Sequence, residues 1–208
     1  MDWQLDATEA RVLGALMEKE ITTPDYYPLS TNALVNACNQ KSNREPVVSY
    51  DEGTVEDALE SLRHKGLVTR VTGESRVAKH EQRFTEKFNL GRREAALLCV
   101  LMLRGPQTPG ELRGRSERLY TFDDLEAVEG TLTRLAEMEY VKKLSRRVGF
   151  KEQRWAQLLA GDVEESSEGA SPVSASEHGL SDRERIARLE SDFAALKQEF
   201  ENFRRNFE

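Results

Sequence analysis

The sequence has few of the residues from which catalytic and metal sites are built. Its 208 residues include two cysteines and three histidines. Cys38 and Cys99 each lie among apolar residues with helical spacing and without a CxxC pattern, so we expect both to be reduced core residues. His64, His80 and His178 show no metalloprotease spacing, and no nucleophile elbow or phosphate-binding glycine loop is present. We therefore expect no enzyme activity, no cofactor and no metal.

Long hydrophobic runs are also missing. No apolar stretch approaches the length that spans a bilayer. The first residues, MDWQLDATEARV, lack the basic and hydrophobic regions of a signal peptide. An apolar fraction of 38% still suffices for modest cores. We therefore expect a soluble, cytoplasmic protein that has no membrane partner.

Negative charge is concentrated at one end of the chain. The formal net charge is −7, but residues 159–208 contain 12 Asp and Glu against 6 Lys and Arg. Residues 1–158 then contain 25 acidic and 24 basic residues, so this body is nearly neutral. Local charged patches in the body are therefore more informative about partners than the total charge.

Three blocks of sequence occur twice in the same order, which indicates an internal duplication. LDATEARVLGALM matches LGRREAALLCVLM at an offset of 85, and the following Thr23 and Pro24 match Thr108 and Pro109. TVEDALESLRHKGLVTRV matches AVEGTLTRLAEMEYVKKL at an offset of 73, and EQRF matches EQRW at an offset of 71. The first copy therefore has extra residues between its first two blocks.

The pattern of each copy predicts three helices and a hairpin. In the first copy, apolar residues recur at helical spacing over 12–17, 33–38 and 55–62. Asp6 with Glu9 has capping-box spacing, and Ser30 is a suitable N-cap. Gly66 is expected to end the third helix, and residues 67–71 and 76–84 to form two strands.

This order predicts a mainly α fold with small β-hairpin wings (α+β), arranged as two tandem winged helix-turn-helix domains over 1–88 and 89–158. The phrase ALESLRHKGLVTRV resembles the passage from recognition helix to wing in that superfamily. TTPDYYPLSTNALVNACNQKSNREPV and MLRGPQTPGELRGRSERLY are similar to the YceH family of bacterial proteins. The resemblance covers about residues 3–158. It implies a pair of winged-helix domains and no established activity.

The remaining chain is predicted to be an acidic flexible linker over 159–180 and a heptad helix over 181–208. Ser181 and Glu184 have capping-box spacing at the start of this helix. The seam for self-association consists of Ile186, Leu189, Phe193, Leu196, Phe200 and Phe203. A homodimeric coiled coil is one interpretation. Because phenylalanines are bulky for a two-stranded seam, an amphipathic helix that folds back on its own domains is the other.

Charge suggests where double-stranded DNA would bind. The predicted third helices carry acidic residues at 51–60 and 123–129, which would repel phosphate. Residues 63–93 carry nine Lys and Arg against three acids, and residues 142–154 carry six against one. Cations on two wings could neutralise phosphates without reading bases. They could instead be solvated or form ion pairs with neighbouring acids.

The loop ACNQKSNREPVV, residues 37–48, has two interpretations. Its amides and cations could contact nucleic acid from the turn between the second and third helices. They could equally hold the loop together, with Asn39 as a helix C-cap. The candidate nucleic-acid-binding residues are Lys41, Arg44, Arg76, Lys79, Lys142, Lys143, Arg146 and Arg147.

A protein-interaction module is the alternative function. Acidic tandem winged helices resemble the ScpB type of chromosome-segregation protein, which grips a protein partner. The acidic third helices would then dock on a basic partner, and the tail would add avidity. We favour DNA binding in a regulator-like role. It should depend on the wing cations and weaken steeply with salt.

Overall fold

A computed structural model of the chain describes residues 4–71, 77–146, 152–161 and 197. The chain separates into two compact units, Met1–Ser167 and Glu168–Glu208. In the second unit, only Lys197 is described, and it is helical and exposed. The six predicted seam residues and nearly all of the predicted linker and C-terminal helix lie outside the described residues.

The first half of the larger unit contains helices and a small antiparallel sheet. Its strands lie in the order β1-β3-β2, so the short β1 pairs with β3 at the edge of the hairpin. The elements, in chain order, are α1 (Ala7–Thr22), η1 (Pro24–Tyr26), β1 (Leu29–Ser30), α2 (Thr31–Cys38), α3 (Glu52–His64), β2 (Val68–Val71) and β3 (Lys79–Gln82).

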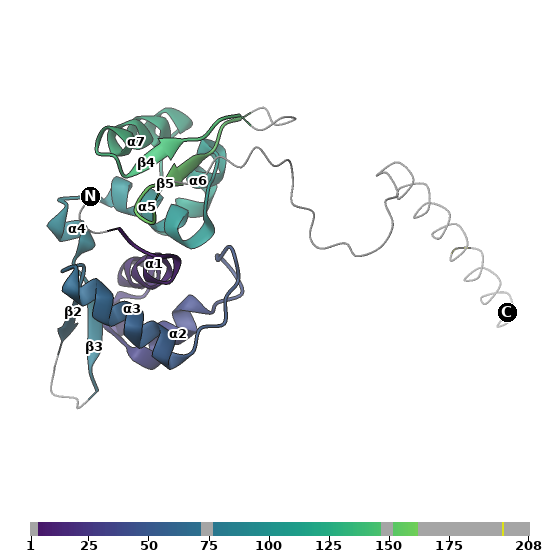
Figure 1. The fold of residues 1–208 in the computed structure, drawn as a ribbon. Coiled ribbons are helices and arrows are strands. Elements are labelled where there is room, and N and C mark those ends of the chain that lie inside the picture. The colour runs from purple at the N-terminus through teal and green to yellow at the C-terminus, as the bar shows by residue number, and fades with distance from the viewer. Residues whose placement is uncertain (1–3, 72–76, 147–151, 162–196, 198–208) are drawn as a thin grey trace, which may run out of the picture. The chain divides into compact units, whose positions relative to one another are not determined.

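The second half has the same order of main elements after a short connecting helix. Its two strands pair antiparallel, and Gln107 forms a further bridge to Trp155. The larger unit is therefore mainly helical with two small antiparallel sheets, which confirms the predicted α+β class (Figure 1). The elements are α4 (Phe84–Lys87), α5 (Arg92–Arg104), α6 (Pro109–Ser116), α7 (Leu125–Glu137), β4 (Val141–Lys143) and β5 (Trp155–Gln157).

Local sequence signals set the helix boundaries. Asp6 and Glu9 form the expected capping box, in which each side chain accepts a backbone N–H bond of 2.7 Å from the other residue. Ser30 caps α2 by accepting from the Ala33 N–H. Gly66 follows α3 with φ +67°, a conformation that favours glycine, and the chain then enters β2.

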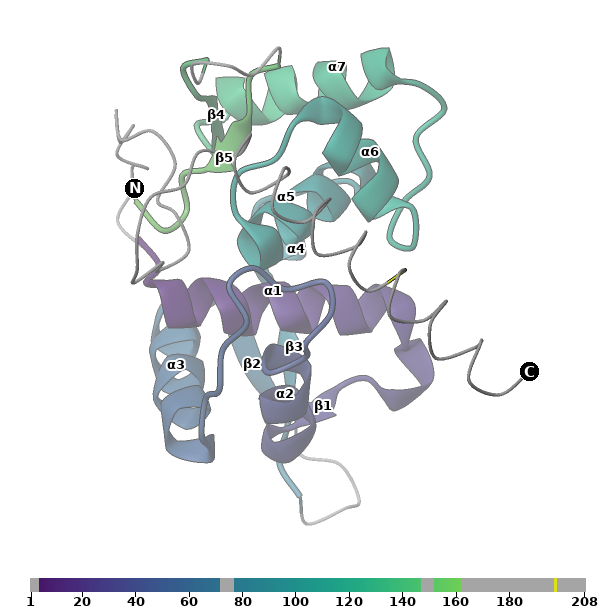
Figure 2. The same ribbon diagram turned by 90° about the vertical axis from the view of Figure 1, so that its right-hand side faces the viewer.

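The two first helices, α1 and α5, form the centre of the larger unit. Figures 1 and 2 show α1 between the other elements of the first half and α5 of the second. All residues from Glu9 to Glu18 of α1 and from Glu94 to Leu103 of α5 are buried. Each helix therefore packs on its own half and on the other half at the same time, which joins the halves through one continuous core.

The strand register corrects one part of the sequence match. Val68 pairs with Gln82 in the first hairpin, and its equivalent Val141 pairs with Gln157 in the second. The returning strands therefore correspond at an offset of 75, not at the 71 of the EQR match. The EQR match is wrong because Glu81 and Gln82 lie on β3, whereas Glu152 and Gln153 precede β5.

The match of Thr23 and Pro24 with Thr108 and Pro109 is also wrong in structural terms. Thr23 ends α1 and precedes η1, whereas Thr108 is the N-cap of α6. The true counterpart of Thr108 is Ser30, the N-cap of α2. The additional residues of the first half thus include η1 and the approach to β1.

Candidate nucleic-acid interface

The third helix of each half presents an acidic surface. Asp51 and Asp124 are the N-caps of α3 and α7, each accepting a backbone N–H bond of 2.8 Å. These carboxylates suit a helix N-terminus but repel phosphate. The exposed acidic residues around the two caps and along the two helices include Asp51, Glu52, Glu56, Asp57, Glu60, Asp123, Asp124, Glu126 and Glu129.

The first hairpin carries fewer cations than the sequence count suggested. Arg70 on β2 is exposed, Lys79 on β3 is half-buried, and Arg76 lies outside the described residues. The other cations of residues 63–93 lie beyond the strands, at the end of α3, around α4 and on α5. The hairpin ends at Gln82 because Phe84, fully buried, starts α4.

Several of those other cations are engaged in ion pairs. Arg83 lies 2.6 Å from Glu86 and 3.6 Å from Glu81. Lys65 donates to the buried Glu9 at 2.6 Å, which links the end of α3 to the start of α1. The ion-pair interpretation therefore fits Arg83 and Lys65, whereas Arg70 has no ion pair among the described residues.

The second hairpin places one of its cations beside an aromatic residue. Lys143 is exposed at the end of β4, and its Nζ lies 5.8 Å from the ring centroid of Trp155 on β5. Lys142 is half-buried and Arg146 is exposed beyond the strand. Arg147 lies outside the described residues. The described part of this hairpin therefore presents Lys142, Lys143 and Arg146 within a short segment.

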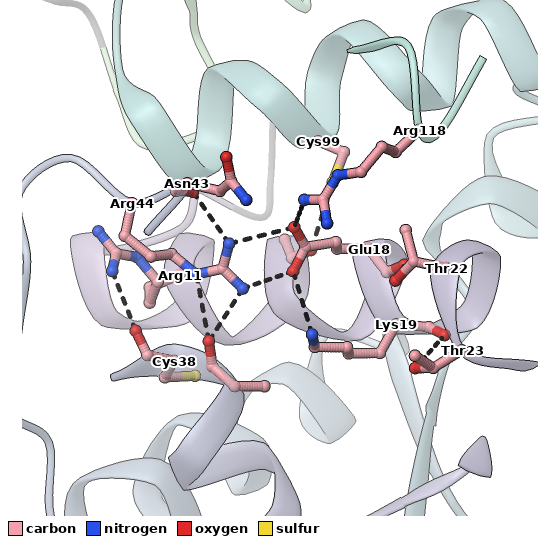
Figure 3. Close-up of polar contacts among 12 residues, drawn as sticks. Arg11, Glu18, Lys19, Thr22, Thr23, Cys38, Asn43, Arg44, Cys99 and Arg118 are labelled. Carbon is pink, nitrogen blue, oxygen red and sulfur yellow. Dashed lines mark hydrogen bonds and ion pairs between the residues drawn. The ribbon is translucent and has the colours of Figure 1, made fainter. Parts of the chain in front are cut away.

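The loop between α2 and α3 contains a buried arginine. The Arg44 side chain is 0% exposed, and its Nη2 donates to Glu18 Oε2 of α1 at 2.6 Å. Its Nη1 donates to the Asn43 carbonyl at 2.9 Å (Figure 3). The expectation that Arg44 contacts nucleic acid is therefore corrected: its guanidinium is enclosed and its donors are already used.

Arg44 and a second arginine hold the carboxyl end of α2. Arg44 Nε and Nη2 donate to the Ala37 carbonyl at 3.1 and 2.9 Å. Arg11 of α1 donates to the Cys38 carbonyl at 3.1 Å and to the Pro46 carbonyl at 2.7 Å. The last carbonyls of a helix lack intrahelical partners and carry partial negative charge, so the two guanidinium groups satisfy and stabilise this end.

Glu18 is the only described acid that pairs with the Arg44 guanidinium. Burial alone would raise the pKa of Glu18, but the hydrogen bonds and charge of Arg44 outweigh it, so this pKa is lowered. Lys19 and Arg118 also lie near its carboxylate, at 3.7 and 3.5 Å. Arg118 comes from the second half, so the carboxylate connects both halves (Figure 3).

The loop also contacts the second half through its backbone. Glu45 N–H donates to the Leu103 carbonyl at 2.9 Å, and Arg104 donates to the Asn43 side-chain oxygen. Asn39 caps α2 as expected and exchanges two hydrogen bonds with the Tyr50 backbone, at 2.7 and 2.8 Å. The loop therefore braces the junction of the halves, while Lys41 is exposed at its surface.

The sequence interpretation missed Arg11 and Glu18. Both lie within the apolar stretch of α1, where a single charged residue normally marks the solvent face of an amphipathic helix. For Arg11 the available signal was that its helical neighbours are apolar or small, whereas Glu18 begins the charged run EKE and carries no such signal. The pattern around Arg11 indicates a helix buried all round, whose charges need partners.

The described residues offer little else for chemistry. They contain no group of three or more His, Cys, Asp and Glu side chains placed to hold a metal ion. No helix in the described ranges is both long and apolar enough to span a bilayer. Both cysteines are buried free thiols, as expected, and burial raises the pKa of Cys38 to about 12.

Residues 5–150 match the family described as "Protein of unknown function, DUF480", and the chain belongs to this family. It is 73% identical over all 208 residues to a UPF0502 protein of Solibacter usitatus, all of which is covered. It is 52% identical to a UPF0502 protein of Citrifermentans bemidjiense, over 93% of this chain and 90% of that protein. UPF0502 protein YceH of Salmonella newport is 46% identical, over 97% of each chain. The resemblance to the YceH family is thereby confirmed.

Proposed function

We propose that this protein is a tandem winged-helix protein that binds double-stranded DNA in a regulator-like role and catalyses no reaction. Each half has three main helices followed by an antiparallel hairpin, the order typical of a winged helix-turn-helix domain. In this interpretation, α3 and α7 are the third helices, and β2–β3 and β4–β5 are the wings. The wings would contact phosphates, and the acidic helices would not enter a groove.

The observation that carries the proposal is the same separation of charge in both halves. The third helices expose carboxylates, whereas the hairpins beside them carry Arg70 and Lys79, and Lys142, Lys143 and Arg146. A surface that pairs with phosphate needs local cations, even where the net charge of the whole chain is negative. Two such hairpins in one compact unit would give two surfaces that can contact phosphates.

Fluorescence anisotropy of the full chain with random-sequence duplex DNA tests this proposal. Titrations at several salt concentrations should show affinity that falls as salt rises, because binding releases counterions from DNA. The variants Arg70→Gln/Lys79→Gln and Lys142→Gln/Arg146→Gln should each weaken binding and reduce the salt slope by about one unit per lost phosphate contact. A third variant, Arg92→Gln/Lys197→Gln, removes two exposed cations elsewhere and should bind as the wild type does.

Absence of binding at low salt would overturn the proposal. Equal loss in the control and hairpin variants would also overturn it, because the effect would then come from net charge and not from the hairpins. Circular dichroism and melting curves of each variant establish that the fold is retained.

The exposed acidic faces of α3 and α7 favour a second candidate, a protein-interaction module for a basic partner. The variant Glu56→Gln/Asp57→Asn should then lose a partner that the hairpin variants still bind. Pull-down with each variant and identification of the retained protein would distinguish the candidates. A partner that is kept by the acidic-face variant contradicts this second function.

A further inference from the structure

We propose that Arg104, Arg115 and Arg118 form a binding site for a phosphate group at the junction of the two halves. The inference does not depend on the hairpins. It concerns a small hollow in the larger unit whose lining includes these three arginines together with Glu18 and Asn43. Cys99, Val100, Leu103 and Leu119 form the apolar part of the same lining.

Two segments, the end of α5 and the end of α6, bring the arginines together. Arg104 is the last residue of α5, Arg115 lies in the last turn of α6, and Arg118 follows that helix. Arg118 reaches Glu18 of α1 at 3.5 Å, and Arg104 donates to Asn43 of the bracing loop. The site therefore exists only where α1, the loop and the second half meet.

Cations exceed acids at this place. Arg44 already holds Glu18 by two hydrogen bonds. Among the described residues, the only other acid in ion-pair contact with these arginines is Glu111, which lies 3.4 Å from Arg115. Four arginines, counting Arg44, thus face two carboxylates in the described structure. Burial, and then repulsion from the neighbouring arginines, lowers the pKa of Arg104. An anion would relieve this repulsion.

The exposure of the arginines defines where the ligand would lie. The Arg118 and Arg115 side chains are 63% and 35% exposed, so their guanidinium groups can turn toward a ligand from solvent. The hollow holds only about one water molecule, so a phosphate group would bind over its mouth. Guanidinium forks match phosphate oxygens in pairs, so three arginines that line one hollow favour an anion with several oxygens, such as a phosphate group.

A simpler role for these residues is electrostatic. Arg104 and Arg115 occupy the last turns of α5 and α6, where cations stabilise the negative end of the helix dipole. That role requires no ligand and predicts no binding. The two interpretations therefore differ in a measurable way.

Isothermal titration of the full chain with pyrophosphate at low salt tests the site. We expect one binding site and a rise in melting temperature, and at least tenfold weaker binding in Arg115→Gln/Arg118→Gln. Arg118→Lys keeps the charge but loses the fork, so it should bind with intermediate affinity. The control Arg92→Gln/Lys197→Gln should bind as the wild type does. No binding by the wild type, or equal binding by wild type and Arg115→Gln/Arg118→Gln, would overturn the proposal.

The same variants identify the source of the phosphate group. If Arg115→Gln/Arg118→Gln loses pyrophosphate but binds duplex DNA normally in the anisotropy assay, the site takes a free phosphate-bearing molecule. If it loses both, the site contacts the nucleic-acid backbone. Both outcomes support the site, and the hairpin variants report separately on the proposed function.

Discussion

Gly14 of α1 lies against Cys99 of α5, whose thiol donates to the Gly14 carbonyl at 3.4 Å. The two residues are separated by the offset of 85 that relates the first helices, so they occupy equivalent positions. A residue that contacts its own equivalent lies on a two-fold axis in a symmetric dimer. The contact between Gly14 and Cys99 is therefore of the kind found at the axis of an isologous dimer, here between α1 and α5 of one chain.

Close approach of these helices requires the glycine. A Cβ at Gly14 would lie 3.1 Å from Leu103 side-chain atoms and 3.2 Å from the Met102 Cβ. We expect Gly14→Leu to destabilise the protein by about 1–3 kcal/mol through overpacking. Urea unfolding measures the change. Gly130→Leu is the control, because a Cβ there meets nothing within 4 Å and the helix gains up to about 1 kcal/mol.

Removal of the buried guanidinium should be among the most damaging single changes. Arg44→Met leaves the Glu18 carboxylate and the Ala37 carbonyl without their main partner, and the expected cost is about 3–5 kcal/mol. Chemical denaturation of the variant checks this value. Lys41→Met, at an exposed position in the same loop, should change stability by less than about 0.5 kcal/mol. Equal effects of the two substitutions would contradict the bracing role.

The lowered pKa of Glu18 predicts acid sensitivity. A carboxyl group whose pKa is lower in the folded state stabilises the fold above its unfolded pKa, ordinarily 4.5. This stabilisation is lost as the pH falls through the folded value. Denaturation from pH 7 to pH 3 should therefore show a steeper loss of stability below pH 4.5 in the wild type than in Glu18→Gln. Identical pH profiles would show that the pair does not govern acid stability.

The predicted C-terminal helix should govern oligomeric state. Phe193→Asp/Phe200→Asp places two charges in the predicted heptad seam, which a coiled coil would not tolerate. Light scattering of the full chains should give a dimer for the wild type and a monomer for the variant. A monomeric wild type would favour the alternative, in which an amphipathic helix packs on its own chain.

The features of the fold that the sequence predicts correctly are those set by residues close together in the chain. Asp6 with Glu9, Ser30 and Asn39 were identified correctly because a cap depends on residues a few positions away. The two-residue strand β1 was missed, since Leu29 and Ser30 pair with residues 49 or more positions away and no local pattern encodes that pairing. The EQR match is wrong for a related reason: the register of a strand is set by its pairing with the neighbouring strand, which a short sequence match does not contain.

The candidate site was less predictable than the fold. Arg44 and Lys41 lie in one loop and look alike as cations, yet one is enclosed and the other is exposed. The difference depends on Glu18, which is 26 residues away and was assigned no role in the sequence interpretation. The number of cations expected on the first hairpin was too high, because Phe84 enters the core and thereby ends the hairpin early.

Amide chemical-shift mapping of the full chain with a short duplex shows directly which surface of the protein contacts DNA. If DNA binds through the hairpins, the largest perturbations should occur in β2–β3 and β4–β5, including Arg70 and Lys143, and they should shrink as salt is added. The exposed residues of α3 and α7 should change little. Perturbations centred on α3 and α7, or none at low salt, would contradict DNA binding through the two basic hairpins.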